Sequence, residues 1–218
     1  MSRDLSGADG AADAGTQGEL AKLGVSRETL GDLERYVALL RHWQRRINLI
    51  SPNTLSEIWD RHIVDSAQLF ALRPDAEIWL DLGSGGGLPG IVIAVLVKNR
   101  GIGRVHLVES NQKKAAFLRH VIQALALPAV VHAARIEDCI GHIEQPQVIT
   151  ARALASLDTL IGYTNLLLKS GAVGLFPKGR DHQEELTEAL RNWQFSYTLQ
   201  PSVTDPKARI IEVGFPGA

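Results

Sequence analysis

The chain of 218 residues contains a single cysteine, Cys139. One thiol excludes an internal disulfide framework and any zinc site built from several cysteines. A lone cysteine is expected in a reducing compartment. We therefore predict a cytoplasmic protein in which Cys139 is a small buried side chain and not a nucleophile.

Long apolar runs are also missing. The longest, residues 91–97, has seven residues, whereas a membrane-spanning helix needs about 20. The first residues lack the basic-then-apolar pattern of a signal peptide. Hydrophobic residues make up 45% of the chain and charged residues 22%, which is the balance of an ordinary globular protein. We therefore expect one domain with no membrane partner.

The net charge of −1 shows no strong excess of either sign, but the charge is unevenly distributed. Residues 1–34 hold three basic and seven acidic side chains, and the remainder holds 20 basic and 17 acidic ones. Cations cluster at residues 41–46, 98–104 and 113–119. These clusters fit solvated helix faces as well as nucleic-acid contacts. The composition therefore permits an RNA or DNA partner without requiring one.

The first part of the chain predicts a tail followed by helices. Residues 1–18 are rich in Gly, Ala, Asp and Ser, so they bury too little apolar surface to offset the entropy of ordering, and we predict a disordered tail. In residues 19–75, Ser26 is a candidate helix cap, and apolar side chains at helical spacing predict two helices. We expect this helical extension to form one compact unit with a domain over residues 76–218.

Short apolar runs alternate with helical patterns from residue 77 onward. The predicted strands cover residues 77–82, 104–109, 129–132, 147–151 and 172–176, and the helices between and after them cover 89–99, 111–125, 157–168 and 182–193. This alternation predicts an α/β fold with a parallel sheet covered on both faces. The last two runs, 195–203 and 207–215, are joined by a turn too short for a parallel crossover. The result is a seven-stranded mixed sheet with one reversed strand.

A glycine-rich segment, residues 81–90 (DLGSGGGLPG), joins the first predicted strand to a helix. Its glycines let the backbone turn sharply and let a ligand approach the main chain. Pro89 suits the first turn of the helix that follows. Open α/β sheets bind nucleotides at such strand-to-helix loops, so this segment is the candidate cofactor site.

The residues around this loop favour one cofactor. Gly85, Gly87 and Gly90 match the dinucleotide pattern, which is weak on its own. Asp81, at the strand tip, would repel a pyrophosphate and attract the ammonium and sulfonium groups of S-adenosylmethionine. Glu109, at the next strand tip, can accept both ribose hydroxyl hydrogens but fits either cofactor. The terminal hairpin is typical of class I S-adenosylmethionine-dependent methyltransferases, which are Rossmann-like, so we favour a methyltransferase over an NAD-dependent oxidoreductase.

Two further segments follow predicted strands and so lie near the same crevice. Residues 135–138 come after the third strand, where this fold binds adenine. The alternative is that Glu137 and Asp138 only cap the next turn. Arg152 follows the fourth strand, and we expect its side chain to point into the crevice. The alternative is that Arg152 only forms a salt bridge on the surface.

Several motifs together resemble a specific family. They are residues 48–51 (NLIS), 59–66 (WDRHIVDS), 81–90, 109–114 (ESNQKK), 150–153 (TARA) and 176–179 (FPKG). Their order and sequence resemble the bacterial 16S ribosomal RNA (guanine-N7) methyltransferases, also called glucose-inhibited division protein B. The resemblance covers roughly residues 35–180, and the GLPG segment with the RHxxDS helix is its most specific part.

The resemblance implies methyl transfer from S-adenosylmethionine to N7 of one guanosine in 16S ribosomal RNA, with the RNA or the small-subunit particle as partner. By motif position it implies cofactor contacts from Gly83, Leu88, Ile136, Glu137 and Arg152, with Glu109 at the ribose. Asp81 and Gly85 complete the predicted cofactor-binding set. Methylation of another RNA or of a small molecule stays open as an alternative.

Guanine N7 has a lone pair and no proton, so its methylation requires alignment of the reactants and no general base. We therefore expect no catalytic acid or base and no metal, in a monomeric enzyme. Substrate-positioning candidates are Arg61, His62, Asp65 and Ser66 on one helix and Lys178 after the fifth strand. Their alternatives are an Arg61–Asp65 surface pair, core packing for His62 and Ser66, and simple solvation for Lys178.

Overall fold

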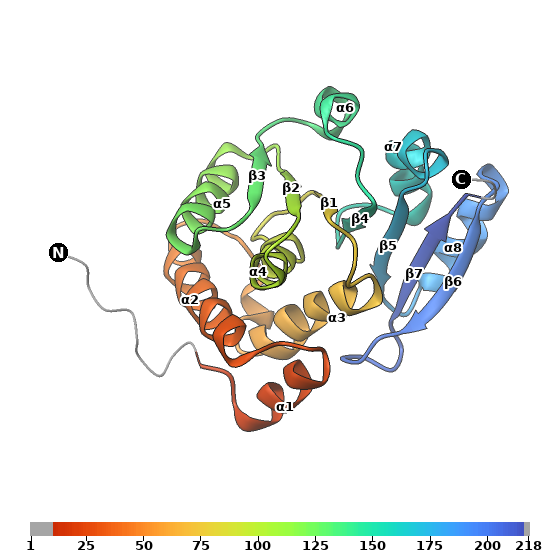
Figure 1. The fold of residues 1–218 in the computed structure, drawn as a ribbon. Helices are drawn as coiled ribbons and strands as arrows, with labels where there is room; N and C mark the ends of the chain where they lie inside the picture. Colours follow the sequence, from red (N-terminus) through yellow and green to blue (C-terminus); the bar gives the residue numbers. More distant parts are fainter. Residues whose placement is uncertain (1–10, 216–218) are drawn as a thin grey trace.

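The computed structural model describes residues 11–215 and contains one seven-stranded sheet with the order β3-β2-β1-β4-β5-β7-β6 (Figure 1). The strands are β1 (Ile78–Leu82), β2 (Arg104–Val108), β3 (Ala129–His132), β4 (Val148–Ala151), β5 (Val173–Lys178), β6 (Ser196–Pro201) and β7 (Arg209–Gly214). Strands β1 to β5 are parallel, and β7 is antiparallel to both β5 and β6. The predicted α/β class and the mixed sheet with one reversed strand are confirmed.

Helices cover both faces of this sheet. They include α4 (Gly90–Arg100), α5 (Gln112–Leu125), α6 (Ile136–Cys139), η3 (Ile140–His142), α7 (Leu157–Lys169) and α8 (His182–Asn192). Successive strand residues point to opposite faces, so Trp79 and Leu107 pack in one core with α4 and α5. Leu80 and Val108 pack in a second core with α7 and α8. Within residues 11–215, every helix is too short or too polar to cross a bilayer.

The helices that precede the sheet belong to the first of these cores. They are α1 (Ala14–Lys22), α2 (Arg27–Gln44), η1 (Pro52–Thr54), the π-helical segment η2 (Trp59–Val64) and α3 (Asp65–Leu72). Ser26 caps α2 as predicted, because its hydroxyl accepts a hydrogen bond of 3.2 Å from the backbone N–H of Thr29. Buried side chains of α2 and α3 pack with those of α4 and the sheet. The domain boundary between residues 75 and 76 stays a prediction.

The prediction of a disordered tail is wrong for residues 11–18. Helix α1 begins at Ala14, where Asp13 caps it by accepting a 2.8 Å hydrogen bond from the backbone N–H of Thr16. The Thr16 hydroxyl donates to Asp60 at 3.2 Å, and Leu20 is fully buried. Composition failed here because the surface that α1 packs against, η2, comes from a segment more than 40 residues away. Residues 1–10 lie outside the described part, where the tail remains a prediction.

Candidate functional site

A cavity of about 950 Å³ lies at the carboxyl ends of β1, β4 and β5. This is the edge at which open α/β sheets bind ligands, and the volume lies within the usual range for small-ligand sites. The glycine loop after β1, the segment after β4, the η2–α3 helix and the β6–β7 turn supply its walls.

The glycine loop presents bare backbone to this cavity. Gly83 and Gly85 line it and have φ values of +66° and +56°, a region that side chains with a Cβ disfavour. A Cβ on Gly85 would meet nothing closer than 3.6 Å, so the loop is open at Gly85, whereas a Cβ on Gly83 would lie 2.6 Å from Cδ1 of Leu154. On the opposite side, a Cβ on Gly87 would lie 2.4 Å from Cγ1 of Ile91. The loop therefore packs tightly against α4 and leaves room for a ligand.

Asp81 lies beneath this loop and does not line the cavity. Its Oδ2 accepts a hydrogen bond of 3.2 Å from the backbone N–H of Gly90, and its Oδ1 accepts one of 2.9 Å from the hydroxyl of Thr150. The pKa of Asp81 is raised to about 6, because the effect of burial outweighs the lowering effect of its hydrogen bonds. Asp81 thus holds β1, β4 and the start of α4 together. Its direct contact with a ligand stays a prediction, and the geometry favours an indirect role.

Glu109 also holds the loop. Its Oε2 accepts a 2.8 Å hydrogen bond from the backbone N–H of Gly85, and its Oε1 accepts one of 2.7 Å from that of Asn111. Ile136 is half-buried and Glu137 is exposed, both in α6. None of these three predicted residues is among those that line the cavity, so their contacts with a cofactor stay predictions. The predicted cofactor residues that do line it are Gly83, Gly85, Leu88 and Arg152.

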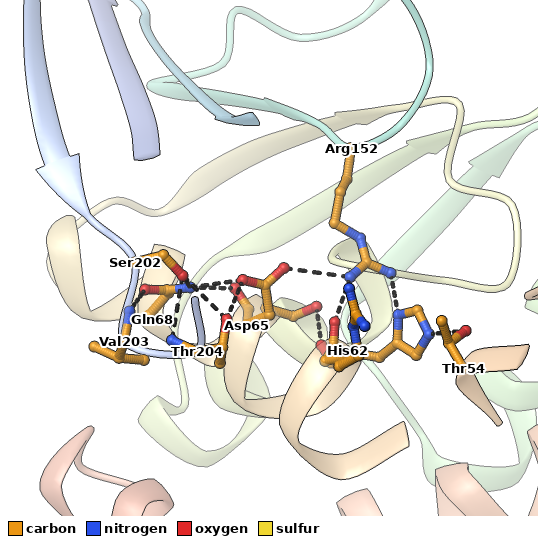
Figure 2. A network of polar contacts seen from close by, with 10 residues as sticks. Thr54, His62, Asp65, Gln68, Arg152, Ser202, Val203 and Thr204 are labelled. Atoms are coloured by element: carbon orange, nitrogen blue, oxygen red, sulfur yellow. Dashed lines mark hydrogen bonds and ion pairs between the residues drawn. The ribbon is translucent and has the colours of Figure 1, made fainter. Parts of the chain in front are cut away.

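Arg152 is the centre of the polar network in Figure 2. Its Nη1 donates to the backbone carbonyl of Arg61 at 2.9 Å and to Oδ2 of Asp65 at 3.3 Å. Its Nη2 donates to Nδ1 of His62 at 2.6 Å, and Nε2 of His62 lies 2.8 Å from the hydroxyl of Thr54. Because Nδ1 faces a guanidinium donor, the ring proton belongs on Nε2. Arg152 thus joins the end of β4 to the η2 segment.

The electrostatics keep the His62 ring neutral. Burial, together with the positive charges of Arg152 and Arg61, lowers the pKa of His62 to about 4. Near pH 7 the ring therefore carries one proton and accepts from Arg152. Both ring nitrogens are engaged in this network, and a role of His62 in positioning the substrate stays a prediction.

The network continues from Asp65 to the β6–β7 turn. Oδ1 of Asp65 accepts from the amide of Gln68 at 2.8 Å and from the hydroxyl of Thr204 at 3.0 Å. The Gln68 side-chain oxygen accepts from the backbone N–H of Val203 at 3.0 Å. The alternative of an Arg61–Asp65 surface pair is wrong, because Arg61 pairs with Glu57 at 3.3 Å. The network therefore ties α3 to a turn more than 130 residues later.

The two remaining predicted residues are both engaged. The hydroxyl of Ser66 is fully buried and donates to the backbone carbonyl of His62 at 2.6 Å. The side chain of Lys178 is 9% exposed; it pairs with Glu185 at 2.6 Å and donates to the carbonyl of Ala155 at 2.7 Å. The alternative that Lys178 is simply solvated at the surface is therefore wrong. A phosphate contact stays a prediction, and it requires Lys178 to exchange this carboxylate for a phosphate.

Several supporting residues were not identified from the sequence. The buried hydroxyl of Tyr36 donates to the Gly86 carbonyl at 2.6 Å. The Gln44 side-chain oxygen accepts from the backbone N–H groups of Leu49 and Ile50 at 2.9 and 3.1 Å, and both of these residues line the cavity. Gln44 interrupts an otherwise apolar helical stripe, and this break in the pattern could have identified it as a residue with a special role. The turn over residues 204–208 also lines the cavity, and nothing in its sequence indicated this.

Two other predictions concern groups outside the cavity walls. Cys139 is buried as predicted, and burial raises the pKa of its thiol. Residues 11–215 contain no group of three or more His, Cys, Asp or Glu side chains placed to hold a metal ion.

Comparison with known sequences gives long matches. A family model described as rRNA small subunit methyltransferase G matches residues 29–211. The Ribosomal RNA small subunit methyltransferase G of Methylobacterium radiotolerans is 52% identical over 194 residues, which are 89% of this chain and 92% of that protein. The protein of the same name from Brucella anthropi is 51% identical over 189 residues, covering 87% of this chain and 89% of its own length.

Comparison with solved structures identifies more distant neighbours. The methyltransferase PaMTH1 of Podospora anserina has a TM-score of 0.59 at 12% identity, covering 83% of this chain and 87% of its own. A precorrin-6y C5,15-methyltransferase from Geobacter metallireducens has a TM-score of 0.54 at 16% identity, covering 77% and 91%. At this identity the likeness concerns the fold alone, and it agrees with the predicted Rossmann-like methyltransferase fold.

Proposed function

The chain belongs to the rRNA small subunit methyltransferase G family, and on this premise we propose that it transfers a methyl group from S-adenosylmethionine to N7 of one guanosine in 16S ribosomal RNA. The family predicted from the sequence motifs is confirmed, and an NAD-dependent oxidoreductase is excluded. The observation that carries the proposal is 52% identity over 89% of the chain, together with a cavity at the carboxyl edge of the sheet.

The residues present fit the cofactor. Gly83, Gly85 and Leu88 line the cavity, and the space beside the Gly85 backbone is open to a ligand. We propose that these residues and Arg152 contact S-adenosylmethionine, which supplies an electrophilic methyl group when bound. Asp81 and Glu109 hold the loop in place through backbone N–H groups. Ile136 and Glu137 are proposed to contact the adenine from the end of β3.

The side chains of the cavity position reactants and remove no proton. Guanine N7 offers a lone pair, so the rate depends on holding it close and in line. His62 does not serve as a base in this proposal, because Arg152 and Thr54 engage both of its nitrogens. The methylated purine is cationic, and the carboxylates of Glu57 and Asp60 line the cavity. Such fixed negative charges favour a developing positive charge.

The substrate partner is proposed to be 16S ribosomal RNA or the small-subunit particle. Arg61 has a side chain that is 59% exposed at the cavity wall, where it can reach a nucleotide, and Lys178 lies deeper. The protein is proposed to be a monomer, to be checked by sedimentation velocity. The cytoplasm, where bacterial 16S RNA is assembled, is the proposed compartment.

The proposal is tested by mass spectrometry of 16S RNA nucleosides from a strain lacking the gene. We expect one 7-methylguanosine to disappear and to return when the wild-type gene is supplied. The Arg152→Ala gene should fail to restore it, whereas Arg191→Ala, an exposed change on α8, should restore it. Retention of every 7-methylguanosine in the deletion strain would refute the substrate assignment, and full restoration by Arg152→Ala would remove Arg152 from the site.

A further inference from the structure

Two segments of the chain contain cations and no acidic residue. Residues 35–56 hold four arginines, and residues 110–136 hold two lysines and two arginines. Neither segment contains Asp or Glu, although the whole chain has 24 acidic against 23 basic residues. Positive charge is therefore concentrated in two stretches that are about 60 residues apart in the sequence.

The fold brings these stretches together, because α2 and α5 pack side by side (Figure 1). The ring of Trp43 in α2 lies 5.6 Å from that of Phe117 and 5.5 Å from that of His120, both in α5. We use the name cationic face for the cations of these two neighbouring helices and of the turn after α2, namely Arg41, Arg45, Arg46, Lys113, Lys114 and Arg119. Arg45, Arg46, Lys113 and Arg119 are exposed, and Arg41 and Lys114 are half-buried.

The cationic face is not neutralised from within the protein. Among residues 11–215, the ion pairs involve cations such as Lys22, Arg73 and Arg191, but none of the six that define the face. Lys113 and Lys114 also occupy the first turn of α5, where the helix dipole disfavours positive charge. An arrangement that is electrostatically unfavourable in the free protein suits a partner that supplies negative charge.

The cationic face also reaches the cavity. Lys114 lines the cavity itself, and Leu49, which lines it as well, comes three residues after Arg46. A nucleic-acid strand whose base entered the cavity would therefore have its neighbouring phosphates beside these cations. Phosphate contacts from Lys and Arg supply most of the sequence-independent affinity for nucleic acids.

We propose that the cationic face binds the RNA phosphates that flank the target guanosine. This inference rests on the proposed function and adds the surface by which the substrate is held. It commits to the RNA backbone as the partner. An acidic ribosomal protein would be a different partner, and the experiment separates the two.

The experiment compares two triple variants with equal change in charge. The test variant is Arg45→Gln, Arg46→Gln and Lys113→Gln. The control is Lys22→Gln, Arg27→Gln and Arg191→Gln, all exposed and on other parts of the surface. Binding is measured from low to moderate salt with 16S RNA of the deletion strain, both as free RNA and as small-subunit particles.

We expect the test variant to bind free RNA and particles at least about tenfold more weakly near 0.1 M salt. The slope of log affinity against log salt should fall by about 2 to 3, since each lost phosphate contact removes about 0.7 to 0.9. The control should keep the wild-type slope, and both variants should bind S-adenosylhomocysteine as the wild type does. If the triple variant does not fold, Arg46→Gln alone should lower the slope by about 0.8.

Equal losses in the test and control variants would mean that only net charge matters, and would overturn the proposal. A loss confined to the particle would assign the cationic face to a ribosomal protein and would overturn it as well. If the wild type methylates 16S RNA and the test variant has the same KM for that RNA and the same salt slope as the wild type, the inference about the cationic face fails while the proposed function stands. If the wild type methylates neither form of the RNA, the proposed function fails first.

Discussion

Replacing Asp65 by asparagine removes the single carboxylate that pairs with Arg152 in the described structure. The asparagine has nearly the same shape, so the change removes charge and leaves the packing intact. Arg152 keeps two neutral acceptors, the Arg61 carbonyl and Nδ1 of His62. The asparagine NH2 also replaces one of the two accepting oxygens, which face Arg152 on one side and Gln68 and Thr204 on the other. The ion pair is therefore isolated only by the double-mutant cycle described below.

The expected loss lies between two limits. Breaking a fully buried ion pair costs about 3–5 kcal/mol, and an exposed pair contributes about 0–1 kcal/mol. The side chains of Arg152 and Asp65 are 17% and 16% exposed, and neutral hydrogen bonds remain. We therefore expect the free energy of unfolding to fall by about 1–2 kcal/mol, and Tm by about 2–8 °C for a chain of this size.

Urea unfolding of the wild type, Asp65→Asn, Arg152→Gln and the double variant measures the coupling between the two side chains. We expect a coupling of about 1–2 kcal/mol. The matched control is the cycle of Glu57→Gln, Arg61→Gln and their double variant, because the Arg61–Glu57 pair is 59% and 54% exposed and its coupling should be less than about 0.5 kcal/mol. A coupling between Asp65 and Arg152 no larger than that of the control would refute the idea that this network holds the cavity wall.

Two further predictions concern the loop and the buried histidine. Gly87→Ala should lower the free energy of unfolding by about 2–5 kcal/mol, because of left-handed backbone strain and the close contact with Ile91. The control is Gly171→Ala, where φ is positive but the space is open, and it should lower that free energy by only about 1–2 kcal/mol. Equal losses in the two variants would contradict the packing argument. The pKa of His62 falls to about 4 in the folded state, so its contribution is complete above pH 6.5 and is lost as pH falls towards 4. The wild type should lose up to about 3 kcal/mol more than His62→Gln over that range, and parallel curves of stability against pH would contradict it.

The contacts that the sequence did not reveal have a common origin. Residues 11–18 look too polar to fold, yet α1 forms because η2 provides a surface for Leu20 and a partner for Thr16. The ligand contact of Asp81 stays a prediction, but the hydrogen bonds that its carboxylate accepts from Gly90 and Thr150 were not predicted. In both cases the deciding partner is distant in sequence or belongs to a different element. Local composition and position at a strand tip contain no information about that partner.

The order of strands and helices, the reversed last strand and the glycine loop followed from sequence alone, because each depends on local periodicity, turn length or a short motif. Tertiary structure decided the rest. Arg152 meets His62, which precedes it by 90 residues, and Asp65 meets Thr204, which follows it by 139. The two cationic segments lie close together because α2 packs against α5, with Trp43 against Phe117. Such contacts depend on how rigid elements pack against one another, and no repeat or spacing along the chain records that geometry.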